Sequence, residues 1–230
     1  MNTAIAQRLA LLHQRIAAAE AEAGRPPGSV QLLAVSKTQN AARVREALAA
    51  GQRVFAENYV QEALDKMAAL HEAGVLSWHF IGPIQSNKTR PLAEHFDWIH
   101  SIDRLKIAQR LNDQRPTERP PLNVLIEVNV SGEDSKAGAA PADVPALAAA
   151  IAALPRLCLR GLMCIPAPAS GLDQQRLPFR QLRELRDALL ASGHATCTEL
   201  SMGMSADFPA AILEGATLIR VGTDVFGPRQ

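Results

Sequence analysis

Lys37 is the side chain in this sequence best placed for covalent chemistry. It follows the apolar residues 32–35, which are typical of a buried strand. A lysine amine that leaves an apolar strand is partly desolvated, and desolvation favours the nucleophilic form that makes Schiff bases with aldehydes. The alternative is a strand-end lysine whose charge extends into solvent. Lys37 is therefore a candidate Schiff-base lysine.

A second set of residues has the types that bind phosphate. Ser201 opens the sequence Ser-Met-Gly-Met-Ser before a helical pattern, and Gly222 and Thr223 follow the last apolar run. Small residues let backbone N–H groups approach an anion, and a helix N-terminus adds unpaired N–H groups and the positive end of a dipole. The alternative is that these residues only form tight turns. We take Ser201, Gly222 and Thr223 as a candidate phosphate site.

Arg220 lies between Ile219 and Val221 in an apolar run, so its side chain points to the opposite face from theirs. Burying a guanidinium is costly unless it finds acceptors. A lysine for an aldehyde, amides for a phosphate and an arginine for a pyridine nitrogen together match pyridoxal phosphate (PLP).

The elements that must position these residues alternate regularly along the chain. Apolar, β-rich runs occupy residues 30–37, 53–58, 77–82, 97–103, 122–130, 158–165, 198–203 and 217–222. Helical patterns occupy residues 41–50, 59–73, 87–95, 103–113, 142–154, 173–192 and 206–215. Uniformly apolar runs joined by helical crossovers predict a parallel sheet covered by helices. Eight such units suit a closed (β/α)8 barrel of the TIM type, an α/β fold of roughly 250 residues.

An amphipathic helix precedes the first strand, with Ile5, Leu9, Leu12 and Ile16 spaced by three and four residues and a stop at Gly24. Too few residues follow the last strand for an eighth outer helix, so we expect the opening helix to fill that place. Residues 1–230 then form a single barrel domain. Because sites in this fold lie where strands end, Lys37 and the phosphate residues are expected at one mouth.

Composition excludes several other classes of protein. The chain carries 24 basic and 23 acidic residues, a formal charge of +1. This balance disfavours nucleic-acid binding. A membrane span needs about 18 consecutive apolar residues, and no stretch of the sequence is that long. Charged residues interrupt the apolar positions at the N-terminus, which is not typical of a signal peptide. We therefore expect no membrane association and a cytoplasmic location.

Six motifs in this order resemble the YggS/PROSC family of pyridoxal phosphate homeostasis proteins, which share the barrel of alanine racemase. They are LAVSKT at 33–38, FAENYVQE at 55–62, WHFIGPIQSNK at 78–88, GLMCIP at 161–166, LSMGMS at 200–205 and IRVGTDVFG at 219–227.

The resemblance assigns roles to individual residues. It implies that Lys37 holds PLP as a Schiff base and that Arg220 meets the pyridine nitrogen. It implies that Ser201, Gly222 and Thr223 hold the phosphate, and that Asn58 and His79 are neighbours of the cofactor.

Two positions depart from the family's pattern. Ala56 stands where glycine is usual, and Asp224 where a small apolar residue is usual. A carboxylate at position 224 would repel a phosphate unless it points away.

Two functions fit a PLP site, and a third fits the barrel alone. A racemase or decarboxylase needs a second acid/base, which related enzymes supply as a tyrosine from an extra domain, whereas this chain has Tyr59 as its one tyrosine. Alanine racemases work with an arginine at the pyridine nitrogen, so Arg220 does not argue against an enzyme. The lack of a second acid/base group in the sequence is the better argument against one. A phosphosugar isomerase leaves Lys37 and Arg220 without a joint purpose. We therefore expect a monomeric, non-catalytic PLP carrier for PLP homeostasis, with PLP-dependent apoenzymes as possible partners.

Overall fold

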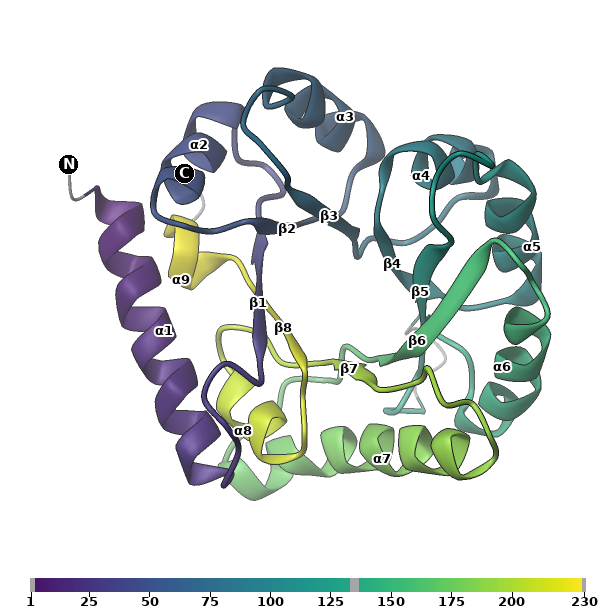
Figure 1. Ribbon diagram of the computed structural model, residues 1–230. Coiled ribbons are helices and arrows are strands. Elements are labelled where there is room, and N and C mark those ends of the chain that lie inside the picture. Colours follow the sequence, from purple (N-terminus) through teal and green to yellow (C-terminus); the bar gives the residue numbers. More distant parts are fainter. Residues whose placement is uncertain (1–2, 133–136, 229–230) are drawn as a thin grey trace.

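The computed structural model describes residues 3–132 and 137–228. Its centre is a closed barrel of parallel strands in sequence order, in which the last strand pairs with the first (Figure 1). The strands are β1 (Gln31–Val35), β2 (Val54–Glu57), β3 (Ser77–Phe80), β4 (Trp98–Ile102), β5 (Leu122–Glu127), β6 (Leu157–Met163), β7 (Glu199–Ser201) and β8 (Leu218–Val221). The expected (β/α)8 barrel is confirmed, and the ends of each strand lie within three residues of the predicted ones.

Helices surround the barrel on the outside (Figure 1). They are α1 (Ala4–Glu22), α2 (Ala41–Ala49), α3 (Val60–Ala69), α4 (Thr89–His95), α5 (Leu105–Gln114), α6 (Val144–Ala152), α7 (Leu172–Ala191), α8 (Phe208–Leu213) and the one-turn α9 (Thr223–Phe226). Short 3₁₀ helices, η1 (Ser86–Lys88) and η2 (Pro141–Asp143), precede α4 and α6. Only η1, η2 and α9 differ in kind from the sequence expectation, because single turns carry no readable hydrophobic period.

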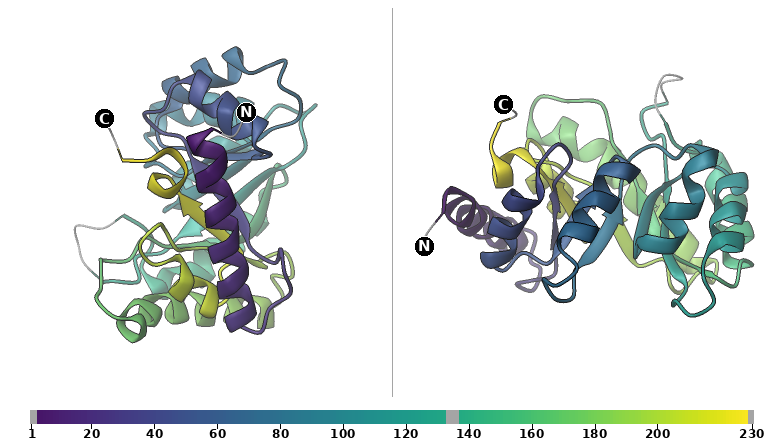
Figure 2. Two further views of the ribbon diagram at one scale, coloured as in Figure 1. Left: turned by 90° about the vertical axis from the view of Figure 1, so that its left-hand side faces the viewer. Right: turned by 90° about the horizontal axis from the view of Figure 1, so that it is seen from above.

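The opening helix α1 closes the outer ring where an eighth crossover helix is missing. It packs against α2, α8 and α9 and covers β8 and β1 from outside (Figures 1 and 2). Its buried stripe contains Ile5, Leu9, Leu12 and Ile16. Thr3 begins the helix, since its side-chain oxygen accepts a hydrogen bond from the Ala6 N–H at 3.2 Å. The expectation that this helix fills the gap is confirmed.

The core has two parts. A large apolar layer lies between the strands and the helices, and a smaller cluster fills the inside of the barrel. The inner cluster consists of Leu33, Val35, Ala56, Ile81, Leu125, Met163 and Leu218. Two residues that pair directly on neighbouring strands point to the same face of the sheet. Any residue that pairs with a member of the inner cluster therefore also points into the barrel. None of the described helices is long and apolar enough to cross a membrane.

Candidate functional site

Lys37 and the last strand meet at one small cleft at the mouth of the barrel. The cleft is lined by Val35, Lys37, Thr38 and Gln39 from the end of β1 and by Gly222, Thr223, Phe226 and Gly227 from the end of β8. The two ends are adjacent because β8 pairs with β1 and closes the barrel. The structure therefore brings together the predicted lysine and two of the three predicted phosphate residues.

Gly222 lets the two strand ends approach closely. A Cβ atom at this position would lie 3.3 Å from the Val35 carbonyl oxygen and 3.4 Å from its Cβ. A side chain at position 222 would therefore crowd the end of β1 at Val35.

Asp224 points away from this cleft. Its Oδ2 atom accepts a hydrogen bond from Nη1 of Arg15 on α1 at 2.5 Å. The carboxylate therefore faces the opening helix, and the arginine neutralises its charge. Contrary to what its position in the sequence had suggested, the Asp224 carboxylate therefore does not repel a phosphate bound at Gly222 and Thr223.

Arg220 and Ser201 lie inside the barrel. Ser201 pairs with the inward Leu218, and Arg220 pairs with the inward Leu33. Nη1 of Arg220 donates to the Ser201 hydroxyl at 2.7 Å, and Nη2 donates to the Cys164 carbonyl oxygen at 2.9 Å. Arg220 is only 3 % exposed, and burial lowers its pKa. The guanidinium is thus held by acceptors of the protein itself.

Two histidines extend this contact across the barrel. Nδ1 of His100 lies 2.8 Å from the Ser201 hydroxyl, and Nε2 of His100 lies 2.9 Å from Nδ1 of His79. Nε2 of His79 lies 3.1 Å from the hydroxyl of Ser77 at the start of β3. Both histidines are buried, and burial lowers the pKa of His79 to about 3 and that of His100 well below its ordinary value. Both rings are therefore neutral at physiological pH.

Arg220 can only donate, so the Ser201 hydroxyl accepts from it. From Ser201 to Ser77 the protons can run in either order, because each histidine nitrogen in the chain donates or accepts according to its tautomer. In either order each neutral histidine uses one nitrogen as a donor and the other as an acceptor. The chain therefore couples the two tautomers to each other and holds Ser201 against Arg220. The predicted neighbour of the cofactor, His79, thus lies within the barrel and contacts His100.

Asn58 follows β2 on the side of the inward Ala56. Its Oδ1 atom is buried and has no hydrogen-bond partner. The loop after β3 lies against it, because a Cβ atom on Gly82 would be 2.3 Å from the Asn58 carbonyl oxygen. A buried acceptor without a partner is costly, so Asn58 is suited to a ligand that donates a hydrogen bond.

Glu127 and His100 were not assigned a role from the sequence. Glu127 ends β5, pairs with the inward Met163 and is 8 % exposed. Burial raises its pKa to about 7, although the nearby Arg220 opposes that change. A carboxylate at the end of an apolar strand is the sequence feature that could have identified Glu127 as a site residue. For His100, the sequence indicates a position in the fourth strand, but its hydrogen-bond partners lie far away in sequence.

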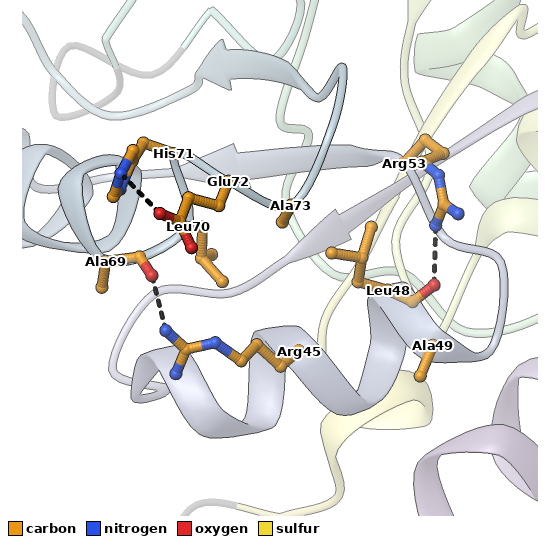
Figure 3. Close-up of a pocket in the computed structure, with 9 residues that line it drawn as sticks. All are labelled: Arg45, Leu48, Ala49, Arg53, Ala69, Leu70, His71, Glu72 and Ala73. Carbon is orange, nitrogen blue, oxygen red and sulfur yellow. Dashed lines mark hydrogen bonds and ion pairs between the residues drawn. The ribbon is translucent and has the colours of Figure 1, made fainter.

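A larger groove lies at the opposite end of the barrel, between the C-terminal ends of α2 and α3 (Figure 3). Its two arginines are engaged, since Arg45 donates to the Ala69 carbonyl at 2.5 Å and Arg53 to the Leu48 carbonyl at 2.6 Å. These contacts cap helix ends. Over residues 3–132 and 137–228, no group of histidine, cysteine and carboxylate side chains could hold a metal ion.

The fold and the mouth together define a class: a (β/α)8 barrel with a lysine after its first strand, small residues after its last and a buried arginine below. The alanine racemase N-terminal domain model matches residues 8–230. The pyridoxal phosphate homeostasis protein of Pseudomonas aeruginosa is 59 % identical over 226 residues, which cover 98 % of this chain and 96 % of the relative. The protein of the same name from Escherichia coli K12 is 55 % identical over 228 residues, 98 % and 97 % of the two chains. This chain belongs to the family of pyridoxal phosphate homeostasis proteins.

Solved structures agree with this membership. PipY of Synechococcus elongatus, with PLP bound, is 42 % identical and superposes with a TM-score of 0.83 over 97 % of this chain and 100 % of that one. The alanine racemase of Corynebacterium glutamicum shares the fold, with a TM-score of 0.65 at 20 % identity. This chain covers only 61 % of that racemase.

Proposed function

We propose that this protein binds PLP at the mouth of the barrel and serves PLP homeostasis as a carrier without turnover of its own. The observation that carries the proposal is the cleft shared by Lys37, Gly222 and Thr223 beside the buried, oriented Arg220. The relatives named above are homeostasis proteins, and one neighbour was solved with PLP bound.

The residues present fit this cofactor. The unpartnered Asn58 Oδ1 supplies a buried acceptor at the mouth, and Gly222 lines the cleft beside Lys37 without a side chain of its own. PLP supplies an aldehyde, a phosphate and a pyridine ring. We assign Lys37 to the aldehyde, Gly222 and Thr223 to the phosphate and Arg220 to the ring nitrogen.

Ser201 and His79 act in this proposal through Arg220. The sequence assigned Ser201 to the phosphate together with Gly222 and Thr223. Because its hydroxyl is fully buried and accepts from Arg220, we assign it instead to orienting the guanidinium. His79 supports the same chain from the other side of the barrel. Since Arg220 only donates, it favours an unprotonated ring nitrogen, which weakens the ring as an electron sink.

An amino-acid racemase or decarboxylase is the second candidate. The barrel shared with alanine racemase favours it, but Tyr59 is 58 % exposed and begins α3. Tyr59 follows Asn58 and so faces away from the inward side of β2. The carrier proposal therefore accounts better for the side chains at the mouth.

We propose that residues 1–230 act as one monomeric unit in the cytoplasm and pass PLP to PLP-dependent apoenzymes, which a carrier would meet there.

The test is reduction with borohydride after loading with PLP, followed by peptide mapping. A pyridoxyl group on Lys37 is the expected result, together with loss of the visible absorption band. A label on Lys88 or Lys106 instead of Lys37 would contradict the proposal that Lys37 binds PLP.

A further inference from the structure

An ionic cluster with a buried centre lies directly behind the loop that carries Lys37, and its Glu62 side chain is 29 % exposed. Its centre is Lys66 on α3, whose side chain is 5 % exposed. Nζ of Lys66 donates to the Ser36 carbonyl oxygen at 2.5 Å, to Oε1 of Glu57 at 2.7 Å and to Oε1 of Glu62 at 2.6 Å. An ammonium has three N–H donors, so all of its donors are used and its position is fully determined.

The cluster holds both neighbours of Lys37 in the chain. Ser36 is bound twice, because its carbonyl accepts from Lys66 and its hydroxyl donates to Oε1 of Glu57 at 2.6 Å. On the other side, the Thr38 N–H donates to Oε1 of Glu62 at 2.5 Å. The backbone before and after Lys37 is therefore attached to the same group of three charged side chains.

Thr38, which is bonded to this cluster, has an unusual backbone conformation. Its φ angle is +64°, and it is the one residue other than glycine with a positive φ among those described. A β-branched residue strongly disfavours the left-handed region, because its Cβ crowds the backbone. The hydrogen bond from Thr38 to Glu62 helps to keep the chain in this conformation immediately after Lys37.

General stabilisation does not account for such a cluster. Lys66 and Glu57 lose their hydration, because their side chains are 5 % and 0 % exposed, and well-packed apolar residues of similar size often stabilise a fold as well as or better than a buried ion pair. The cluster instead fixes the path of the backbone around Lys37, because it links the ends of β1 and β2 to α3 at the mouth of the barrel. Burial also raises the pKa of Glu57, an effect that Lys66 opposes.

We propose that Lys66, Glu57 and Glu62 are positioning residues that aim the amine of Lys37 at the aldehyde of PLP. This inference rests on the proposed function. In the step concerned, the lysine nitrogen bonds to the aldehyde carbon, the carbon–oxygen bond breaks, and the oxygen leaves as water with the two amine hydrogens. The cluster touches none of the reacting atoms. It fixes the turn from which the amine reaches them.

The test separates covalent bond formation from binding of the ring and phosphate. Lys66→Met removes the charge at similar length, Glu62→Gln is the milder change, and Lys106→Met makes the same change as the first on the exposed side of α5. The probes are PLP and pyridoxine 5′-phosphate, which keeps the ring and phosphate but has no aldehyde. We expect at least a tenfold slower appearance of the borohydride-reducible bond in Lys66→Met and a smaller decrease in Glu62→Gln. Affinity for pyridoxine 5′-phosphate should stay within threefold, and Lys106→Met should match the wild type on both probes.

Other outcomes are decisive as well. A wild-type rate of bond formation in both Lys66→Met and Glu62→Gln overturns the positioning role, and so does an equal loss for the two probes, which indicates a general collapse of the site. If Lys66→Met does not fold, Glu62→Gln alone decides by the same two measurements. A Lys37→Ala variant that still acquires the reducible bond contradicts the proposed function instead.

Discussion

Nη1 of Arg220 lies 2.7 Å from the hydroxyl oxygen of Ser201, and this contact joins the last two strands of the barrel inside its core. Each residue would be costly to bury without the other. The contact continues through His100 and His79, so one chain of hydrogen bonds sets the direction of the guanidinium.

We predict that Ser201→Ala weakens PLP binding about tenfold or more and also lowers stability. The change removes one acceptor of a buried guanidinium, and a hydrogen bond to a charged group is worth about 1.5 to 3 kcal/mol. PLP titration by absorbance and urea unfolding measure the two effects. Ser192→Ala is a suitable control, because that hydroxyl donates to the Leu189 carbonyl at the end of α7. Unchanged affinity in Ser201→Ala would show that Arg220 does not act on the cofactor.

Thr223→Ala should weaken PLP retention by a similar factor but leave the free energy of unfolding nearly unchanged. Thr223 is exposed at the cleft, so its loss creates no buried cavity. Inorganic phosphate should compete less well with PLP in the variant than in the wild type. Equal competition in both proteins would place the phosphate elsewhere.

Asp224→Ala should cost less than about 1 kcal/mol of stability, since the ion pair with Arg15 is partly exposed and such pairs contribute little. Affinity for PLP should stay the same, because the carboxylate faces α1. Thermal unfolding and PLP titration check both statements. A tenfold gain in affinity would mean that Asp224 faces the phosphate after all.

The sequence predicted the positions of the strands and helices, but not the side-chain contacts inside the barrel. Hydrophobic periodicity located each strand and each long helix, and the closure of the barrel then placed Lys37 beside Gly222 and Thr223. The partners inside the barrel were not accessible in this way. His100 and Ser201 are 101 positions apart in the sequence, and Arg15 and Asp224 are 209 positions apart. Period-two alternation tells which residues point inward, but strand register and tilt decide which of them touch.

Glu127 should make stability depend on pH. Its pKa is raised from 4.5 to about 7 by burial, so the folded state keeps the proton that the unfolded state loses. The stabilising effect of the neutral carboxyl is complete below pH 4.5 and is lost as the pH rises to 7. A tenfold change in proton affinity corresponds to about 1.4 kcal/mol, so the loss reaches up to about 3 kcal/mol.

Urea unfolding of Glu127→Gln at pH 4.5 and pH 7.5 measures this effect. The variant should match the wild type at the lower pH and exceed its stability at the higher pH. Glu22→Gln, on the exposed side of α1, should show no such gain. The same change in stability between pH 4.5 and 7.5 in Glu127→Gln and in the wild type would contradict the assignment.

The PLP-loaded protein should show no racemase, decarboxylase or transaminase turnover with common amino acids. Inversion at Cα needs one acid/base group on each side of the bound substrate, and each such group contributes roughly 10² to 10⁴ in rate. Lys37 can serve one side. For the other side, Tyr59 is largely exposed, and His79 and His100 are buried, neutral and bonded to each other. Chiral chromatography of alanine and glutamate after long incubation is the measurement. Steady inversion at enzyme-like rates, lost in Lys37→Ala, would overturn the carrier proposal, and Glu127→Gln would then be the first variant to examine for the second base.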